Sequence, residues 1–473
     1  MILVSLLFLP ILAAILVLFI KNKKLANWTA ILFSALTLLL VLQTLGTPIA
    51  DFDLAWLPNL NSRFVLHADG LSKLLLLLTA ISFPAILIST AKNEYKQNNV
   101  FLSLLLFTQA GLIGVFLAAD ALLFYFFWEL ALIPVYFLCS IWGGEKRVAI
   151  TFKFFIYTFL GSLFMLAGIL FVNAHTTDHS FAIQSFIHAS LTQGQQITSF
   201  ALFFIAFAIK MPIFPLHTWQ PDAYEQSPTA VTMVMSAVMV KMGLYGILRW
   251  LMPLFPFAFM AHTHFVVALS VIGVLYASFI AIRQDDIKRL IAYSSIAHIG
   301  LMNAALFTHT QVAVQGVLIQ LFSHGINVVG LWIIADIIEQ QTGTRSMQQM
   351  GGLAKKQPTL AILLVGFALA NIALPLTNSF VGEFLMFNGL FLFNPWMAAL
   401  AGLSIVLAAI YTLNMVQKVA YGEISEKINT MQTPNKGAQA VLIVLLLLVF
   451  VTGVYAQPLF TLTADTLNQL FVK

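Results

Sequence analysis

The chain has 473 residues, of which 60% are hydrophobic and only 9% are charged. Because charged residues make up about 25% of a soluble domain, this composition excludes a soluble protein and predicts an integral membrane protein. The net charge of +5 does not indicate nucleic-acid binding, because the basic residues are spread singly along the chain and form no stripe.

Residues that hold redox centres or metals are scarce in this sequence. Cys139 is the single cysteine, which excludes a disulfide framework and a Cys-x-x-Cys centre. No glycine-rich fingerprint follows a strand, and no His, Cys and carboxylate residues have the spacing of metal ligands. We therefore expect no cofactor and no metal in this chain. If it belongs to a redox enzyme, the electrons travel through other chains.

The first twenty residues are apolar, and no basic residue precedes them. Lys21, Lys23 and Lys24 follow this apolar run. Such a charge order opposes a cleavable signal peptide. It predicts an uncleaved first span whose N-terminus lies outside.

Apolar runs of about 20 residues, the length that crosses ~30 Å of hydrocarbon, recur along the whole chain. They predict about fourteen transmembrane helices, an all-α fold. The runs fall at roughly 2–20, 26–46, 70–91, 98–118, 119–141, 147–172, 198–220, 227–251, 262–282, 286–308, 312–337, 358–391, 395–420 and 437–457.

Loop charge sets the expected orientation. With the N-terminus outside, sixteen Lys and Arg residues fall in inner loops, whereas the outer side holds only Arg63, Arg249 and Lys473, with Lys73 near a span end. The long predicted outer loop 173–196 carries no Lys or Arg. By the positive-inside rule, both termini are predicted on the outer, periplasmic side of a cell inner membrane. We favour a bacterial source.

Prolines interrupt two of the predicted spans. Pro212 and Pro215 break the seventh span, and Leu374-Pro375 breaks the twelfth. Five spans separate the breaks, so the two broken helices run in opposite directions, which is typical of an inverted repeat of spans 4–8 and 9–13. We expect one membrane domain over 1–473. Its parts are N-terminal spans in 1–97, a first repeat in 98–251, a second in 262–420 and a last span in 437–457.

Six ionisable side chains fall near the middle of six different predicted spans. An ionisable group at the bilayer centre costs roughly 2.5–3.5 kcal/mol on insertion scales, so such groups are functional candidates by default. A row of carboxylates, ammonium groups and imidazoles at one depth can carry protons parallel to the membrane plane. The candidate proton relay consists of Glu129, Lys210, Lys241, His298, His324 and Glu383.

Simpler interpretations stand beside the relay. Glu129 and Lys210 taken alone can form a structural ion pair, and each intramembrane histidine can make a helix–helix hydrogen bond. The common depth of all six groups favours the relay. Small and hydroxyl-bearing neighbours are expected to leave room for water beside the relay; they are Gly243, Gly246, Gly325, Ser294, Ser295 and Ser323.

Four further polar residues have other expected roles. Lys153 is predicted to extend to the inner surface, and Asp120 to cap the fifth span. His217 and Asp222 follow the break of the seventh span. Either they take part in proton uptake, or they belong to a solvated loop.

Several motifs together resemble the antiporter-like subunits of respiratory complex I. The motifs are Phe-Phe-Trp-Glu-Leu…Ile-Pro (126–134), Lys-Met-Pro…Pro-Leu-His-Thr-Trp-Gln-Pro-Asp-Ala (210–223), Lys-Met-Gly-Leu-Tyr-Gly (241–246), Asp-Asp-Ile-Lys-Arg-Leu-Ile-Ala-Tyr-Ser-Ser-Ile-Ala-His-Ile-Gly (285–300) and Phe-Val-Gly-Glu-Phe (380–384). The resemblance covers most of the chain and is weakest before Asp69 and after Tyr421. The superfamily also includes Mrp-type cation/proton antiporters and membrane-bound hydrogenase subunits.

Two features favour an M-type subunit within this superfamily. Glu383 stands where the L-type and N-type subunits and Mrp relatives typically carry lysine, and the chain stops soon after the last span. The resemblance implies a modulating pair, a central relay and an outlet, formed respectively by Glu129 with Lys210, by Lys241, His298 and His324, and by Glu383. Tyr224 departs from the family, which often has histidine there, so its role in proton uptake stays open.

The function implied is that of a proton-translocating membrane subunit of NADH-quinone oxidoreductase, coupled to quinone reduction in other chains. Homologous L-type and N-type subunits and the lipid bilayer are its expected partners. Two alternatives remain: a subunit of an Mrp-type Na⁺/H⁺ antiporter or membrane-bound hydrogenase, and a structural spacer that conducts nothing.

Overall fold

The computed structural model describes residues 1–471, so Lys473 lies outside the described residues. Helices dominate the fold, which confirms the all-α prediction. The N-terminal helices are α1 (Ile2–Phe19), α2 (Lys23–Leu45), η1 (Pro58–Leu60), α3 (Gly70–Ser89), α4 (Asn98–Leu117), α5 (Ala121–Trp142), α6 (Arg147–Asn173), α7 (Ile183–Ile187) and α8 (Gln193–Lys210).

The middle of the chain contains the most irregular helical stretch. It comprises α9 (Gln220–Gln226), α10 (Thr229–Val234), η2 (Met235–Met239), α11 (Lys241–Gly246), η3 (Ile247–Leu251), α12 (Met252–Leu254), α13 (Pro256–Arg283), α14 (Ile287–Phe307) and α15 (Gln311–Thr342). The remainder comprises η4 (Met347–Gln349), α16 (Leu353–Lys356), α17 (Pro358–Asn371), α18 (Asn378–Phe393), α19 (Pro395–Ala420), α20 (Glu426–Asn429), α21 (Lys436–Val454) and α22 (Gln457–Phe471).

Twelve helices within residues 1–471 are long and apolar enough to cross a membrane. The two predicted spans missing from that set are the interrupted ones, which α8 and the short pair α17 and α18 represent. The total of fourteen spans and the inverted repeat stay predictions.

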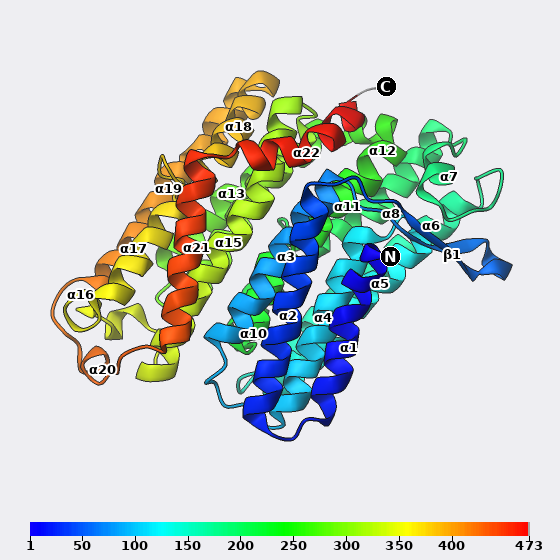
Figure 1. Ribbon diagram of the computed structural model, residues 1–473. Coiled ribbons are helices and arrows are strands. Elements are labelled where there is room, and N and C mark those ends of the chain that lie inside the picture. The colour runs from blue at the N-terminus through cyan, green and yellow to red at the C-terminus, as the bar shows by residue number, and fades with distance from the viewer. Residues whose placement is uncertain (472–473) are drawn as a thin grey trace.

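Three helical stretches form the interior of the bundle. The apolar windows of Thr229–Leu254 and α15 are completely buried, and α14 is nearly so. The helices α1, α2, α19 and α21 are mostly exposed along their apolar stretches and form part of the periphery. In Figure 1 the turn between α1 and α2 lies at the lower end of the bundle, together with α16 and α20, while α22 crosses the upper end. Ionisable residues on the inner stretches are therefore kept away from lipid.

A small antiparallel hairpin, absent from the sequence-based expectation, precedes α3. It consists of β1 (Phe52–Leu57) and β2 (Ser62–Leu66). The hairpin is attached to the start of α5, because the carboxylate of Asp120 accepts hydrogen bonds from Ser62 Oγ and Arg63 N. The same carboxylate accepts from the backbone N–H groups of Leu122 and Leu123, so the predicted helix cap at Asp120 is confirmed.

Both helix breaks lie where the prolines predicted them. The helix α8 ends at Lys210, and regular helix resumes only at Gln220. Between α17 and α18 the backbone passes through left-handed conformations at Ala373 (φ 54°) and Leu376 (φ 78°). Such conformations are unfavourable for residues with a side chain and persist only where the surrounding structure imposes them.

The backbone next to Lys241 departs from the α-helix on both sides. The stretches η2 and η3, which flank α11, are π-helical. In η2 the N–H of Val240 donates to the carbonyl of Met235, five residues back, at 3.1 Å. Single π-helical turns inside α-helices are frequent at functional sites. Lys241 is thus presented from a locally widened helix.

Candidate relay site

Lys241 is completely buried, and two acceptors hold its ammonium group. Its Nζ donates to the backbone carbonyl of Ser236 at 2.7 Å and lies 2.9 Å from Nδ1 of His324. The first acceptor comes from η2 and the second from α15. The structure therefore joins two of the six predicted residues by a direct hydrogen bond between helices.

The same polar chain continues from His324 to Glu383. The imidazole rings of His324 and His298 have centroids 5.5 Å apart. Nδ1 of His298 lies 3.1 Å from Oε1 of Glu383, which also accepts from Gln320 Nε2 at 3.4 Å. Four of the predicted relay residues thus form one chain across η2–α11, α15, α14 and α18.

Polar groups and a small cavity surround the end of this chain. A cavity of about 10 Å³ is lined by His298, Glu383, Ser278, Ser404 and Tyr411 among others. That volume matches about one water molecule. The Nε2 atoms of His298 and His324 have no hydrogen-bond partner within residues 1–471. Each ring therefore keeps one nitrogen without a partner, and His298 also lines the cavity.

Glu129 and Lys210 form a separate pair. Lys210 is 2% exposed at the end of α8, and its Nζ lies 5.5 Å from the centroid of the Trp128 ring. Glu129 is half-buried on α5 and lies within electrostatic range of Lys210. No N–O contact within 4.0 Å joins the two groups in the described part of the chain, and Lys210 Nζ has no hydrogen-bond partner there. A fixed structural ion pair is therefore not what holds Lys210.

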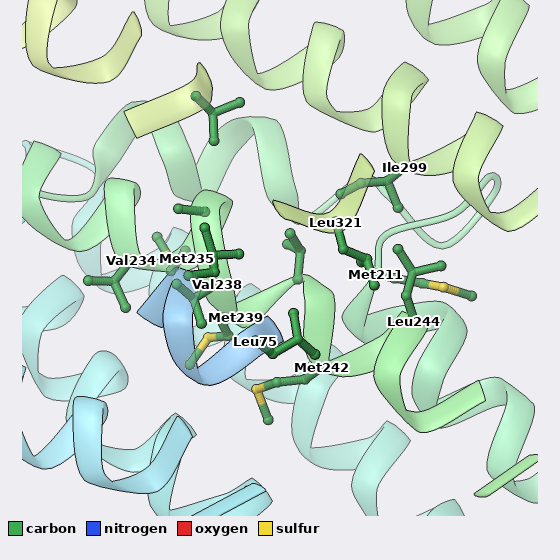
Figure 2. Packing of buried hydrophobic residues seen from close by; sticks show 14 of the residues in the cluster. Leu75, Met211, Val234, Met235, Val238, Met239, Met242, Leu244, Ile299 and Leu321 are labelled. Carbon is green, nitrogen blue, oxygen red and sulfur yellow. The ribbon is translucent and has the colours of Figure 1, made fainter. Parts of the chain in front are cut away.

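An apolar helix contact separates Lys210 from Lys241. A Cβ atom on Gly243 would lie 2.7 Å from the carbonyl oxygen of Phe207 and 2.8 Å from Cβ of Met211. A Cβ on Gly246 would lie 2.5 Å from the Phe207 ring. The expectation that these glycines leave room for water is therefore wrong: they allow α8 and α11 to touch. Met211, Met242 and Leu244 are among the buried side chains in Figure 2.

Three other small residues near the relay, Gly325, Ser294 and Ser323, serve packing or structural hydrogen bonds, whereas the Ser295 hydroxyl has no hydrogen-bond partner within residues 1–471. A Cβ on Gly325 would meet Leu78, so this glycine too admits a neighbouring helix, not water. Ser294 pairs with Tyr411 at 3.1 Å, and Ser323 donates to the carbonyl of Asn378 at 3.2 Å. The predicted wire of six groups is therefore continuous over four of them, and its common depth stays a prediction.

The residues after the first helix break are not part of a solvated loop. His217 is 3% exposed and packs against the rings of Phe214 and Tyr276. Asp222 pairs with Lys153 at 2.9 Å and with Arg289 at 3.2 Å. Lys153, predicted to extend to the surface, ends on this carboxylate.

Tyr224 is completely buried, with its ring 6.0 Å from that of Trp332. Its backbone carbonyl accepts from the Thr232 hydroxyl at 3.2 Å. It thus packs between α9, α10 and α15 instead of facing solvent. Its role in proton uptake remains untested.

Sequence analysis missed three charged residues that the fold buries. Lys288 was counted among the inner-loop residues and Asp336 was not considered, but they are only 3% and 4% exposed. Arg249, assigned to the outer side, pairs with Asp69 at 2.6 Å. Their positions near the predicted span ends did not indicate burial. Neighbouring helices, and not lipid, cover these residues in the fold.

Within residues 1–471, no group of three or more His, Cys, Asp or Glu residues could hold a metal ion. The expectation of no cofactor is not tested by this finding. Proton-exchanging side chains are the chemistry that this site offers.

Comparison with known proteins relates this chain to one family of membrane subunits. Residues 118–410 match the family described as NADH:quinone oxidoreductase/Mrp antiporter, transmembrane. NADH-quinone oxidoreductase subunit M of Rhodobacter capsulatus is 37% identical over 449 residues, 91% of this chain and 87% of that protein. Subunit M of Escherichia coli (strain K12) is 36% identical over 460 residues, 92% of this chain and 90% of that protein.

Solved structures share the whole fold. A chain of respiratory complex I from Thermus thermophilus with bound NADH superimposes with a TM-score of 0.91 at 28% identity, covering all of both chains. A chain of the Mrp complex from Dietzia sp. DQ12-45-1b superimposes with a TM-score of 0.89 at 20% identity, covering 99% of this chain and 97% of that one. The second likeness is one of fold alone.

Proposed function

The chain belongs to the family of NADH:quinone oxidoreductase and Mrp antiporter membrane subunits, and we propose that it is the M-type, proton-translocating subunit of an NADH-quinone oxidoreductase. The observation that carries the proposal is the buried chain Lys241–His324–His298–Glu383. Every member gains and loses protons, and the members come from four helical elements.

The contact between Lys241 and His324 supports transfer of single protons. A bond of 2.9 Å between Nζ and Nδ1 needs one donor and one acceptor. If both groups were cationic, two positive charges 2.9 Å apart would repel by about 6 kcal/mol at an effective dielectric of ~20. The pair therefore holds one shared proton, and a second proton arriving at Lys241 displaces the first toward His298 and Glu383.

Glu129 and Lys210 act as the modulating pair in this proposal. The two groups are not in contact, so a shift of either helix changes their interaction. Bringing the carboxylate to 4 Å from the ammonium is worth about 4 kcal/mol at a dielectric of ~20. Moving one charge across 100 mV requires about 2.3 kcal/mol. The change in interaction energy between Glu129 and Lys210 is thus large enough to drive the transfer of one proton against 100 mV.

The subunit acts within a larger translocase. Electrons pass through other chains, where quinone reduction supplies the driving force, and this chain contributes no redox centre. Its neighbours in the bilayer are other membrane subunits, among them homologous L-type and N-type chains. The location is a bacterial inner membrane, with both termini on the periplasmic side.

The decisive experiment substitutes both ends of the polar chain. The double variant Lys241→Ala with Glu383→Gln, in the purified native complex reconstituted into vesicles, is expected to lower NADH-driven proton pumping by the complex at least about tenfold. The rate of electron transfer from NADH to a soluble acceptor serves as the control that the variant complex has assembled. Unchanged protons per NADH would leave a non-conducting spacer as the better description. Sodium-dependent transport by a complex without NADH activity would favour the Mrp-type alternative.

A further inference from the structure

A buried charged cluster lies at the Lys/Arg-rich end of the interior helices, outside the relay. It contains Asp336 and Glu339 of α15, Lys288 of α14 and Thr229 of α10. The Lys288 ammonium donates to Thr229 Oγ1 at 2.9 Å and forms an ion pair with Glu339. The Thr229 hydroxyl also lies beside Asp336. Three of the innermost helices therefore meet at this cluster.

Asp336 differs from four ion-paired carboxylates of the region. Asp222, Glu225, Asp286 and Glu339 each have a cation within 4.0 Å. Asp336 has none within 4.0 Å among residues 1–471, although it is only 4% exposed. Its Oδ2 accepts from Asn93 Nδ2 at 3.0 Å. A buried carboxylate without an ion pair, placed beside a cavity, is a candidate functional group.

Two polar cavities, which share Glu94, Tyr95 and Gln340 in their linings, adjoin the cluster. One, of about 610 Å³, is lined by Asp336, Asn93, Gln340, Gln341 and other polar residues of the 89–95 and 430–438 segments. The other, of about 690 Å³, is lined by Thr229, Lys288, Glu339 and Arg345 among others. Both volumes hold many water molecules. Asp336 therefore stands between bulk-like water and the interior of the bundle.

A run of buried hydroxyl groups lies between this cluster and the relay. Thr229, Thr232 and Ser236 are spaced three and four residues apart, so they lie along one face of α10 and η2. Both elements pack against α15. The run ends at Ser236, whose carbonyl holds the Lys241 ammonium at 2.7 Å. Asp336 and His324 lie twelve residues apart on α15, about 18 Å of α-helix. Thr229 lies beside Asp336, and Lys241, twelve residues further on, bonds His324.

We propose that Asp336 is the proton-loading carboxylate that supplies the Lys241–His324 pair from the cavities at the Lys/Arg-rich end. The inference rests on the proposed function. A hydronium ion in the cavity gives its proton to a carboxylate oxygen of Asp336 and becomes water. The proton then passes over water and the hydroxyls of Thr232 and Ser236 to Lys241, and Asp336 returns to its carboxylate form.

The test uses the intact complex in vesicles and measures the initial rate of NADH-driven acidification. Asp336→Asn keeps an oxygen that accepts from Asn93 but cannot carry a proton. It is expected to lower the rate at least about fivefold, given that a positioned proton carrier typically contributes a hundredfold or more. Asp336→Glu, which restores the carboxyl group, is expected to retain at least about half the rate of the unsubstituted complex.

Asn93→Ala is the matched control, because it removes the hydrogen bond and leaves the carboxylate in place. It is expected to pump within about twofold of the unsubstituted complex. Thr232→Val, nearly equal in shape, removes a hydroxyl of the run and is expected to lower the rate about threefold; it also tests the inference if Asp336→Asn does not assemble.

Parallel measurement of Lys241→Met separates the two proposals. If Lys241→Met loses pumping while Asp336→Asn and Thr232→Val pump normally, the loading role of Asp336 is overturned and the relay stands. If Lys241→Met itself pumps normally, the proposed function fails. Equal losses in Asp336→Asn, Asp336→Glu and Asn93→Ala would show that Asp336 merely ties the α3–α4 connection to α15, and would also overturn the inference.

Discussion

The two halves of the predicted relay are built differently. From Lys241 to Glu383 the groups touch or nearly touch, with contacts of 2.9 Å and 3.1 Å joined by two histidine rings 5.5 Å apart. Lys210 faces the Trp128 ring and has no hydrogen-bond partner within residues 1–471. The half from Lys241 to Glu383 is therefore connected in this structure, and the half that contains Glu129 and Lys210 is not.

Under the proposed function, the first half conducts protons and the second half controls that conduction. Lys241 with His324 and His298 with Glu383 each lie within hydrogen-bonding distance, whereas the Nε2 atoms of the two rings have no hydrogen-bond partner within residues 1–471. Transfer between Lys210 and Lys241 must cross the contact of α8 with α11, where Phe207 and Met211 meet two glycines. Any proton exchange there requires the helices to separate and water to enter.

The largest effect is expected at the centre of the connected half. Lys241→Met removes the proton carrier that bonds both Ser236 and His324, so the rate of proton pumping in reconstituted vesicles should fall at least about tenfold. Lys241→Arg is the control, because its guanidinium keeps the charge but does not release its proton. Normal pumping by Lys241→Arg would contradict proton release from this position.

A smaller but clear loss is expected in the unconnected half. Lys210→Ala or Glu129→Ala removes one partner of the modulating pair and should lower pumping about fivefold, a typical size for a coupling interaction. The assembled complex should remain, because Lys210 Nζ has no hydrogen-bond partner within residues 1–471 and Glu129 loses only its contact with Ser162 of α6. NADH oxidation by a soluble acceptor checks assembly, and a pumping rate equal to that of the unsubstituted complex would remove the pair from the mechanism.

The apolar contact itself can be strained. Gly243→Ala places a methyl group against the backbone of α8, and overpacking of this kind costs about 1–3 kcal/mol. The purified complex should unfold at a lower temperature. Gly402→Ala is the matched control, because a Cβ there meets nothing within 4 Å. Equal thermal stability of the two variants would argue against a tight contact between α8 and α11.

The smallest effect is expected at Gln320, which lies beside the connected half and contacts Glu383. Gln320→Leu removes a hydrogen bond of 3.4 Å to Glu383 and leaves the bond from His298. Loss of one such bond is worth about 0.5–1.5 kcal/mol, so pumping should fall about twofold. A loss as large as that of Lys241→Met would make Gln320 a member of the chain instead of a support.

Much of the fold follows from the sequence. Long apolar runs and prolines at 212, 215 and 375 place the helices and both breaks within a few residues, because hydrocarbon length and the missing proline N–H are local constraints. The six relay residues were recognisable for the same reason: a charge inside an apolar run is conspicuous. The hairpin at 52–66 was missed, since its alternating pattern is short and lies between stronger signals.

Sequence alone determined that this chain spans a membrane, where its helices break, and which ionisable groups lie within the apolar runs. Tertiary structure alone decided which of those groups touch. Gly243 and Gly246 admit another helix instead of water, and Lys288 and Asp336 are buried by neighbouring helices although they lie near span ends. The physical reason is that the cost of placing a charge in hydrocarbon can be read from one helix. A hydrogen bond between two helices depends on how they pack, and the sequence of either helix alone does not determine that packing.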